Sequence, residues 1–153
     1  MLQSGSVIEE RFGRVMAVVR TAARQLIGAD GVTFVLRDGE HVRYVEEDAI
    51  SPLWKGQRFS ASQCVSGWVI THNERAIIAD IYDDPRVPLA AYRGTFVKSM
   101  AMVPVGKPAV GAIGAYWAIY HRATDSEMET LAAIADSAMI QVEDSQHGTA
   151  STE

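Results

Sequence analysis

The sequence predicts an α+β fold with a mainly antiparallel β-sheet. Three observations lead to this fold class. Apolar residues recur every three or four positions near both ends of the chain, which is the spacing of one face of an α-helix. Between these helical segments, apolar and polar residues alternate in short runs, as in strands with one buried face. Turns that contain glycine separate successive strands, as expected of hairpins. The predicted order is helix, hairpin, loop, helix, strand, long loop, hairpin and helix.

The chain has 153 residues, a net charge of −5 and one cysteine, which excludes an internal disulfide. This length fits one domain, which we place at residues 1–145, followed by a polar tail at residues 146–153 that we expect to be disordered. The acidic charge, without clustered lysine and arginine, argues against nucleic-acid binding. Because we find no run of ~18 apolar residues and no signal-peptide pattern, we expect a cytoplasmic chain without membrane contact.

The first predicted helix covers residues 7–27, and a closing helix begins with a capping box at Thr124–Glu127. The apolar stripe of the first helix consists of Ile8, Phe12, Val15, Val19, Ala22 and Leu26, and that of the closing helix consists of Met128, Leu131, Ala135, Ala138 and Val142. A mean spacing of about 3.5 residues is typical of a left-handed helical pairing. The stripes therefore predict a homodimer through the terminal helices. Alternatively, both stripes pack on the domain's own sheet.

Alternation between the helices predicts strands at residues 32–36 and 42–44, each with one buried face, joined by a type I′ turn at Asp38-Gly39. From residue 46 to residue 63 the alternation stops, and we expect a connecting loop with apolar anchors, followed by a short helix at residues 62–71. A later strand at residues 110–119 contains Gly111 and Gly114. Glycines within a strand indicate a close approach by another backbone or by a ligand.

Residues 67–105 form the candidate site. They are predicted to contain the end of a helix, a strand at residues 76–80, a loop broken by Pro85 and Pro88, and a strand at residues 99–105. Loops of this length in compact domains are usually functional. We therefore expect a small-molecule pocket, and about half of the following candidate wall residues should instead fill the core. The candidates are Trp54, Trp68, Tyr82, Tyr92, Phe96, Met100, Met102 and Tyr116.

Three segments carry a resemblance to a known family. They are SGWVITHNERAIIADIYDDPR at residues 66–86, AYRGTFVKSMAMVPV at residues 91–105 and GAIGAYWA at residues 111–118. Together with the order of elements, they make residues 7–143 resemble a GAF domain of the kind found in bacterial sensor histidine kinases. The resemblance implies a PAS-like sheet of five or six strands, with the terminal helices packed on one face and a ligand pocket beneath short helices and loops on the other.

The resemblance also implies a function. GAF domains of this kind sense a small molecule and pass the change through their terminal helices to an output domain, so we expect a regulatory domain of a two-component signal-transduction protein. We expect no enzymatic activity in this chain, because a kinase activity would lie in an output domain. The alternative is a structural dimerisation module whose pocket is filled by its own side chains and binds no ligand.

Subfamilies with known ligands differ from this sequence at their signature positions. Members that carry a linear tetrapyrrole resemble one another in a cysteine, often followed by histidine, whereas Cys64 is followed by Val65. The cyclic-nucleotide type carries an Asn-Lys pair, whereas Asn73 is followed by Glu74. Members that reduce methionine sulfoxide depend on several cysteines. The sequence therefore shows no bilin, haem or cyclic-nucleotide signature, and the cofactor stays unknown.

Charged residues in the loop allow two interpretations. Asp80, Asp83 and Asp84 offer oxygen ligands to a cation, but no glycine or bidentate glutamate completes a calcium loop. We therefore expect them to cap the strand end and the following turn. Arg86 and Arg93 have the charge to hold an anionic ligand, and ion pairs with the aspartates are the simpler expectation.

His72 and Cys64 also allow two interpretations. A haem or a metal would need His72 as a ligand, but a lone histidine after a helix more often forms a local hydrogen bond. A redox role for Cys64 would need a lowered pKa. Its apolar neighbours instead favour a buried, inert thiol.

Overall fold

The computed structural model describes the backbone of residues 5–151 and the side chains of residues 7–138. Its centre is a six-stranded sheet with the order β3-β2-β1-β6-β5-β4, in which every neighbouring pair is antiparallel. The strands are β1 (Gly31–Asp38), β2 (His41–Ala49), β3 (Arg58–Ser60), β4 (Ala76–Ile78), β5 (Ser99–Gly106) and β6 (Ala109–Trp117). The helices are α1 (Gly5–Thr21), α2 (Ala23–Ile27), α3 (Val65–His72), α4 (Leu89–Tyr92) and α5 (Asp125–Ser151), with 3-10 turns η1 (Ala61–Gln63) and η2 (Ile81–Asp83). The predicted fold class is confirmed.

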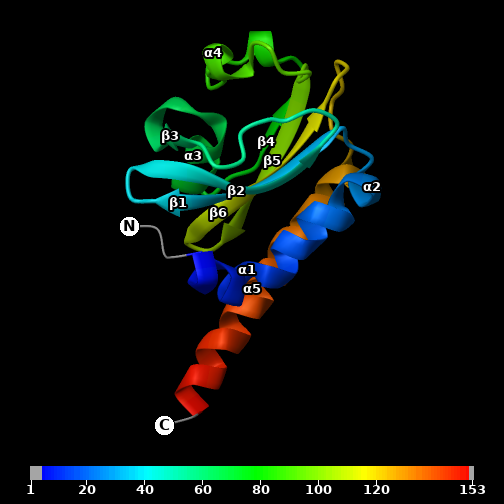
Figure 1. The fold of residues 1–153 in the computed structure, drawn as a ribbon. Coiled ribbons are helices and arrows are strands. Elements are labelled where there is room, and N and C mark those ends of the chain that lie inside the picture. Colours follow the sequence, from blue (N-terminus) through cyan, green and yellow to red (C-terminus); the bar gives the residue numbers. More distant parts are fainter. Residues whose placement is uncertain (1–4, 152–153) are drawn as a thin grey trace.

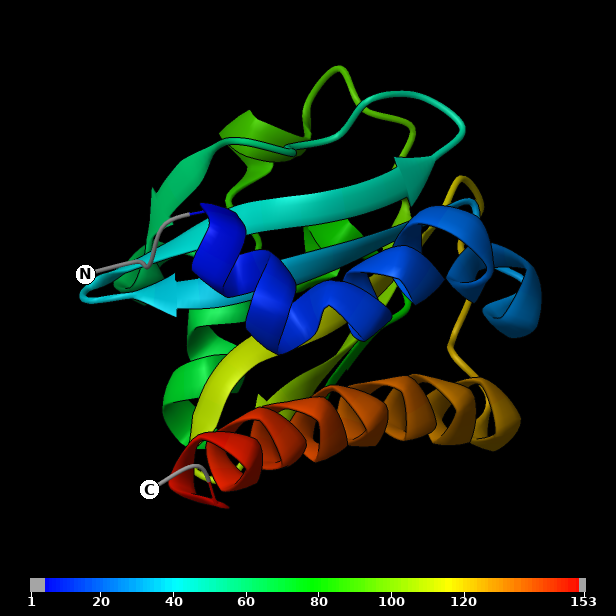
Figure 2. The ribbon, with the colours of Figure 1, turned by 60° about the horizontal axis from the view of Figure 1, so that its bottom comes forward.

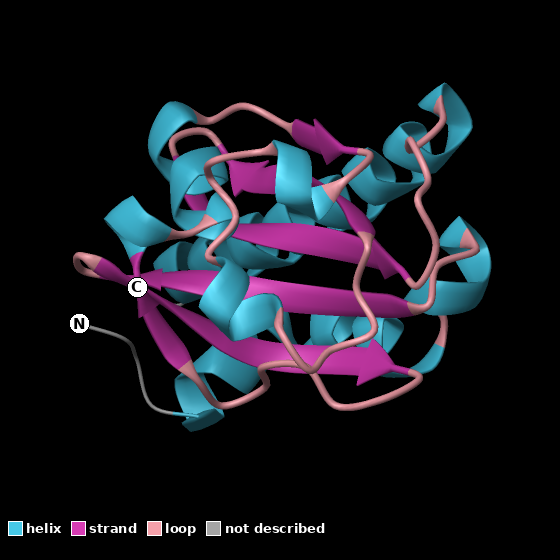
Figure 3. Cartoon of the chain, turned by 90° about the horizontal axis from the view of Figure 1, so that it is seen from above, coloured by secondary structure: helices cyan, strands magenta, loops and turns pink. Residues whose placement is uncertain are grey.

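The two faces of the sheet are covered differently. Helices α1 and α5 lie side by side on one face, which we call the helix face (Figure 1, Figure 2). Short helices and loops cover the opposite face, which we call the pocket face (Figure 3). The predicted placement of the terminal helices on one side is therefore confirmed.

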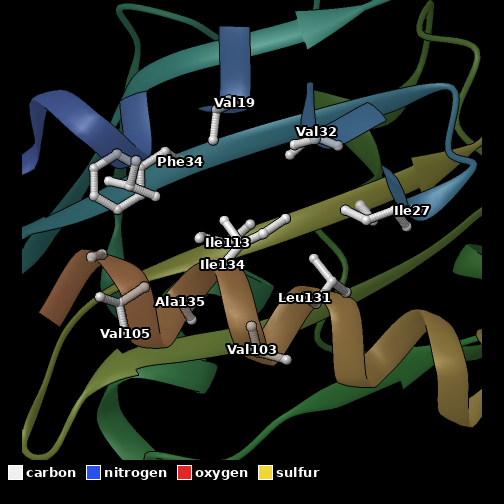
Figure 4. Packing of buried hydrophobic residues seen from close by; sticks show 14 of the residues in the cluster. Val19, Ile27, Val32, Phe34, Val103, Val105, Ile113, Leu131, Ile134 and Ala135 are labelled. Carbon is white, nitrogen blue, oxygen red and sulfur yellow. The ribbon is translucent and has the colours of Figure 1, made fainter. Parts of the chain in front are cut away.

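Side chains from both terminal helices and from the central strands form the helix-face core. Ile113 of β6 lies beside Ile134 of α5, and Phe34 of β1 lies on the same side of the sheet as Val19 of α1 (Figure 4). Cross-strand neighbours in an antiparallel sheet share a face, which explains how three strands present one apolar surface to the helices. Both predicted helix stripes thus pack on the domain's own sheet, except at Ala22 and Leu26; Val142 lies outside the described side chains.

The first helix differs from the prediction in its last turns. The chain leaves helical geometry at Ala22 (φ −138°), so the expected single helix is divided into α1 and α2. After this break Ala23 and Ile27 are buried, whereas the predicted stripe residue Leu26 is 61% exposed. Ala22 and Leu26 therefore do not continue the predicted apolar stripe, because the break shifts the buried face by one residue.

Strand β1 and its turn also differ in detail. All residues from Gly31 to Leu36 are buried, so the predicted single buried face is wrong. The turn consists of Gly39 and Glu40, since Asp38 pairs with His41. Among these residues only Gly39 has a positive φ (62°), which fits a type II′ turn and not the predicted type I′ turn.

The loss of alternation predicted a connecting loop at residues 46–63, but part of this segment forms strands. Strand β2 continues to Ala49, and β3 pairs with its beginning at the edge of the sheet. A β-bulge interrupts β2, because Phe34 pairs with Glu46 while Val35 pairs with Tyr44, which leaves Val45 as the extra residue. The end of β2 was not predicted, because the charged residues at positions 46–48 interrupt the alternation of apolar and polar residues.

The closing helix begins as predicted. Thr124 Oγ1 accepts from Glu127 N–H (3.1 Å), and the Glu127 carboxylate accepts from Thr124 N–H (2.7 Å), which confirms the capping box. Helix α5 runs to Ser151, over most of the segment that the sequence predicted to be a disordered tail. Residues 152–153 of that tail lie outside the described residues. No helix within the described part of the chain is both long and apolar enough to cross a membrane.

Candidate functional site

The candidate site is the pocket-face core. Strands β5 and β6 supply Met100, Met102 and Tyr116, each completely buried. Tyr92 comes from α4, and Trp54 comes from the segment at residues 50–57, which we call the Trp54 loop. These five predicted wall residues belong to one buried cluster, with exposed fractions of 5% or less.

Trp54 lies at the centre of this cluster. Its ring contacts Tyr92 (centroid distance 4.6 Å), Tyr116 (5.3 Å) and Tyr44 (5.5 Å) in tilted or edge-on geometry. Such arrangements are favourable for aromatic pairs because the ring edge meets the electron-rich face. The Trp54 Nε1–H donates to the carbonyl oxygen of Ala91 (2.9 Å). One side chain therefore joins β2, β6 and α4.

Glycine and alanine on β6 make room for the cluster. Gly114 faces the pocket side, and a Cβ atom there would lie 2.6 Å from Tyr116 Oη and 2.7 Å from Met102 Cε. The predicted close approach at Gly114 is thus made by the protein's own side chains. At Gly111 the approaching group is backbone, since a Cβ atom would lie 2.4 Å from the carbonyl oxygen of Val35.

The hydroxyl groups of the cluster have partners inside the protein. Tyr116 Oη lies 2.9 Å from Thr33 Oγ1, and Tyr44 Oη lies 3.3 Å from Ser66 Oγ, with either oxygen able to donate. Tyr92 Oη–H donates to Met100 Sδ (3.3 Å). Within the described residues no buried side-chain nitrogen or oxygen lacks a partner. The buried hydroxyl groups of the cluster are therefore satisfied within the protein.

Burial decides the protonation state of the three tyrosines. Desolvation raises the pKa of Tyr44, Tyr92 and Tyr116 well above the ordinary tyrosine value of 10.0. All three phenols are consequently neutral at physiological pH. Neutral phenols can donate or accept a hydrogen bond, so the site suits an uncharged polar or aromatic molecule.

The other predicted wall residues lie at the margin or outside. Phe96 and Trp68 are partly buried and pack against the cluster. Tyr82 is 62% exposed and does not join it. The side chain of Asp80 accepts from the Tyr82 N–H (2.9 Å), which holds η2 in a turn that directs the ring outward.

Two grooves adjoin Trp68. One, of about 280 Å³, runs between the start of α3 and residues 85–88, and it is lined by Cys64, Trp68 and Arg86 among others. Cys64 also belongs to the pocket-face core, so this groove is a place where solvent comes close to the cluster. The second, of about 570 Å³, lies beside His72 and the turn at Glu40.

The charged residues of the loop are occupied locally. The Asp84 carboxylate accepts from Arg86 at two nitrogens (2.6 and 3.0 Å), which confirms the predicted ion pair. The hydrogen bonds from Arg86 lower the pKa of Asp84. Asp84 Oδ1 also accepts from the Arg86 N–H (2.9 Å), so Asp84 caps its turn as expected. Asp80 was expected to end a strand but instead caps η2, because β4 ends at Ile78. Among residues 7–138, no group of three or more histidine, cysteine or acidic side chains is placed to hold a metal ion.

His72 and Cys64 also have local partners. His72 Nδ1 lies 2.9 Å from the carbonyl oxygen of Trp68, and the His72 ring stacks on that indole at 4.7 Å, which confirms the expected local hydrogen bond. Cys64 is buried, and its sulfur caps α3 by accepting from Gly67 N–H (3.4 Å). The burial expected for this thiol is therefore confirmed.

Sequence reasoning missed Tyr44, Thr33 and Ser66. Tyr44 was assigned to a strand but not to the site, although it contacts Trp54 and Phe59. A tyrosine on the same face of a strand as Val42 is a usable signal, because both residues must then face one core. Thr33 and Ser66 carry no such signal, since the pairing of β1 with β6 brings Thr33 to Tyr116, and the packing of α3 on the sheet brings Ser66 to Tyr44.

Comparison with known proteins shows the family to which this chain belongs. A family model described as GAF domain matches residues 11–143. The chain belongs to the GAF domain family. No curated protein sequence gives a significant match. The pocket-face cluster of this GAF domain therefore has to be interpreted from its own chemistry.

Solved structures share the fold at low sequence identity. The GAF domain of PixJ from Thermosynechococcus elongatus, in its blue-light absorbing form, has a TM-score of 0.76 and 15% identity over 99% of this chain and 95% of its own. Type II free methionine-R-sulfoxide reductase from Thermoplasma acidophilum has a TM-score of 0.74 and 15% identity over 89% and 94%. The GAF-B domain of DevS from Mycobacterium smegmatis has a TM-score of 0.70 and 15% identity over 90% and 96%.

These similarities establish the fold of this GAF domain and leave its activity to the residues of its own site. One of the similar proteins is a reductase, so the fold supports enzymes as well as binding domains. In the part of this chain that the structure describes, Cys64 is the free cysteine and it is buried.

Proposed function

We propose that this GAF domain is a regulatory, small-molecule-sensing domain of a two-component signal-transduction protein, of the sensor histidine kinase type. Its ligand is a small, neutral organic molecule, and its ligand state passes through α1 and α5 to an output domain. In this proposal the chain has no enzymatic activity of its own and acts in the cytoplasm.

The observation that carries the proposal is the composition and covering of the pocket-face core. Neutral phenols and indole nitrogen lie beneath residues 79–98, which we call the cover segment. The backbone hydrogen bonds described inside this segment are local, for example from Arg93 N–H to Leu89 C=O, while Ile81 N–H donates to Lys98 C=O at its base. A segment held at its base and by Trp54 can open with little loss of backbone hydrogen bonding.

The protein's dimeric state belongs to the same proposal. GAF domains that transmit a signal through paired terminal helices act as homodimers in this scheme, and α1 and α5 lie next to each other on one face. The stripe residues that suggested the dimer are buried within the chain, as at Phe12 (6% exposed) and Leu131 (0%). A partner would therefore contact the outer sides of these helices.

The test is native mass spectrometry of the purified protein together with its absorption spectrum and metal analysis. We expect an organic molecule that is released on denaturation, without stoichiometric metal and without a Soret band. Stoichiometric metal or haem that disappears in a His72→Ala variant would contradict the proposal.

The second candidate function is a structural dimerisation module with a filled pocket. The complete burial of Met100, Met102 and Tyr116, with all their polar partners internal, favours it. A protein that carries no small molecule but sediments as a dimer would support this function. A protein that sediments as a monomer at high micromolar concentration would exclude the dimer in both proposals.

A further inference from the structure

The bulge in β2 decides which face of the sheet each of the neighbouring residues Glu46 and Glu47 occupies. Before the bulge, Tyr44 pairs with Val35 and lies in the pocket-face core. After it, Glu46 pairs with Phe34, which lies in the helix-face core. If β2 were regular through Val45, Tyr44 and Glu46 would lie two positions apart and therefore on the same face. The bulge therefore directs Glu46 toward α1.

Glu47 holds the Trp54 loop on the pocket face. Its carboxylate accepts hydrogen bonds from three successive backbone N–H groups, those of Leu53 (2.9 Å), Trp54 (2.8 Å) and Lys55 (2.9 Å). Three bonds to a carboxylate fix the orientation of this short segment. The indole of Trp54 is thereby positioned from β2.

Glu46 joins the same loop to α1. Its carboxylate is only 3% exposed and lies 2.9 Å from both Lys55 Nζ and Arg20 Nη1. Lys55 follows Trp54 directly, and Arg20 belongs to the last turn of α1. A buried carboxylate that loses one of these cations keeps its desolvation cost, so the three groups are favoured as a unit.

Two ion pairs of Glu46 connect the Trp54 loop to α1. A groove of about 240 Å³ lies between them, lined by Met16, Tyr44, Lys55 and Gly56 among others. The carboxylate of Glu46 is therefore a direct contact through which a movement of the loop can reach α1.

We propose that Glu46 couples the Trp54 loop to α1, so that a displacement on the pocket face shifts the terminal helix on the other face. The inference rests on the proposed function only in assigning a signalling role to this displacement. Its test needs no ligand, so failure of ligand binding and failure of the coupling are distinguishable.

The experiment measures amide hydrogen exchange in α1 by mass spectrometry, with Trp54→Phe as the perturbation. This substitution keeps a ring in the cluster but removes the hydrogen bond to Ala91. In the otherwise unchanged protein, Trp54→Phe should accelerate exchange over residues 12–21 by about fivefold or more, the lower end of coupling between sites. In a Glu46→Gln background, adding Trp54→Phe should leave exchange in α1 unchanged.

Arg24→Gln is the matched control background. Arg24 of α2 forms an ion pair with Asp48 of β2 (3.2 Å). The substitution Arg24→Gln therefore removes an ion pair between the same two layers and leaves the contacts of the Trp54 loop in place. Here the effect of Trp54→Phe on α1 should persist. Lys55→Gln breaks the link on the loop side and should abolish the effect, which keeps the test decisive if Glu46→Gln fails to fold. An effect of equal size in the Lys55→Gln or Glu46→Gln background, or none in the parent, overturns the proposal.

Discussion

The two faces of the sheet bury side chains of different chemistry. On β6, the residues that face α1 and α5 are Ile113, Ala115 and Trp117, whereas those on the pocket face include Gly114 and Tyr116. The helix face is covered by two long helices, and the pocket face is covered by short turns. A core beneath long helices resists change, whereas a core that contains hydrogen-bonded tyrosines beneath short helices and loops can rearrange at lower cost. The difference separates a region that holds the fold together from one that can respond.

Val15→Asp tests the helix face with the largest expected effect. Val15 is fully buried in that core, where an unpaired carboxylate would lose its hydration without compensation. We expect a loss of about 4 kcal/mol or more in the free energy of unfolding, so that the variant fails to fold. Urea denaturation followed by circular dichroism measures it.

Leu26→Asp is the control for this substitution. Leu26 lies on α2 and is 61% exposed, so the change should stay within about 0.5 kcal/mol. If Val15→Asp instead gave a folded monomer from a dimeric parent, α1 would contact a partner and not the sheet.

Gly67→Ala tests the packing of α3 on the pocket face and leaves the helix face unchanged. Alanine is favoured over glycine inside a helix by about 1 kcal/mol. A Cβ atom at this position, however, would overlap the backbone carbonyl of Ala61. Because backbone cannot move aside as a side chain can, we expect a net loss of about 2 kcal/mol in thermal or chemical denaturation. Thr71→Ala, on the exposed side of α3, should instead be neutral or slightly stabilising.

Two tyrosine substitutions compare the strengths of buried polar contacts on the pocket face. Tyr116→Phe leaves Thr33 Oγ1 without its partner at 2.9 Å, which should cost about 1–2 kcal/mol. Tyr92→Phe removes a bond to the weaker acceptor Met100 Sδ and should cost less than about 1 kcal/mol. Equal losses in the free energy of unfolding, measured by urea denaturation, would mean that the two hydroxyl hydrogen bonds stabilise the fold equally.

The pH dependence of Glu46 gives the smallest change and concerns the connection between the faces. Burial acts to raise the pKa of Glu46, but hydrogen bonds from Lys55 and Arg20 outweigh it and lower the pKa below the ordinary value of 4.5. A folded-state pKa below the unfolded one stabilises the ionised form, so this contribution is present above the unfolded pKa. It is lost as pH falls through the folded pKa.

The measurement is the free energy of unfolding of the parent and of Glu46→Gln between pH 7 and pH 3. The difference between the two should shrink on acidification below pH 4.5. A constant difference over this range would contradict a stabilising role for the ionised carboxylate.

The sequence by itself determined the elements that depend on neighbouring residues. The capping box at Thr124 and Glu127 formed as predicted because both of its hydrogen bonds lie within one helical turn. The strand at residues 99–105 and the turn at Pro88 likewise follow from local alternation and from the fixed geometry of proline. Trp54, Tyr92 and Tyr116 were also predicted from the sequence, because large aromatic side chains are often buried. The same reasoning missed Tyr44 and wrongly included Tyr82, which is 62% exposed.

The tertiary structure alone decided how these elements meet. The bulge at Val45 depends on the pairing of β2 with β1, and the burial of Glu46 depends on cations from α1 and from the Trp54 loop. In the sequence the same residues read as a charged loop. Leu26 is exposed because the helix breaks at Ala22, and the local sequence pattern did not predict this break. Contacts between residues far apart in the chain set each of these features, and no local period encodes them.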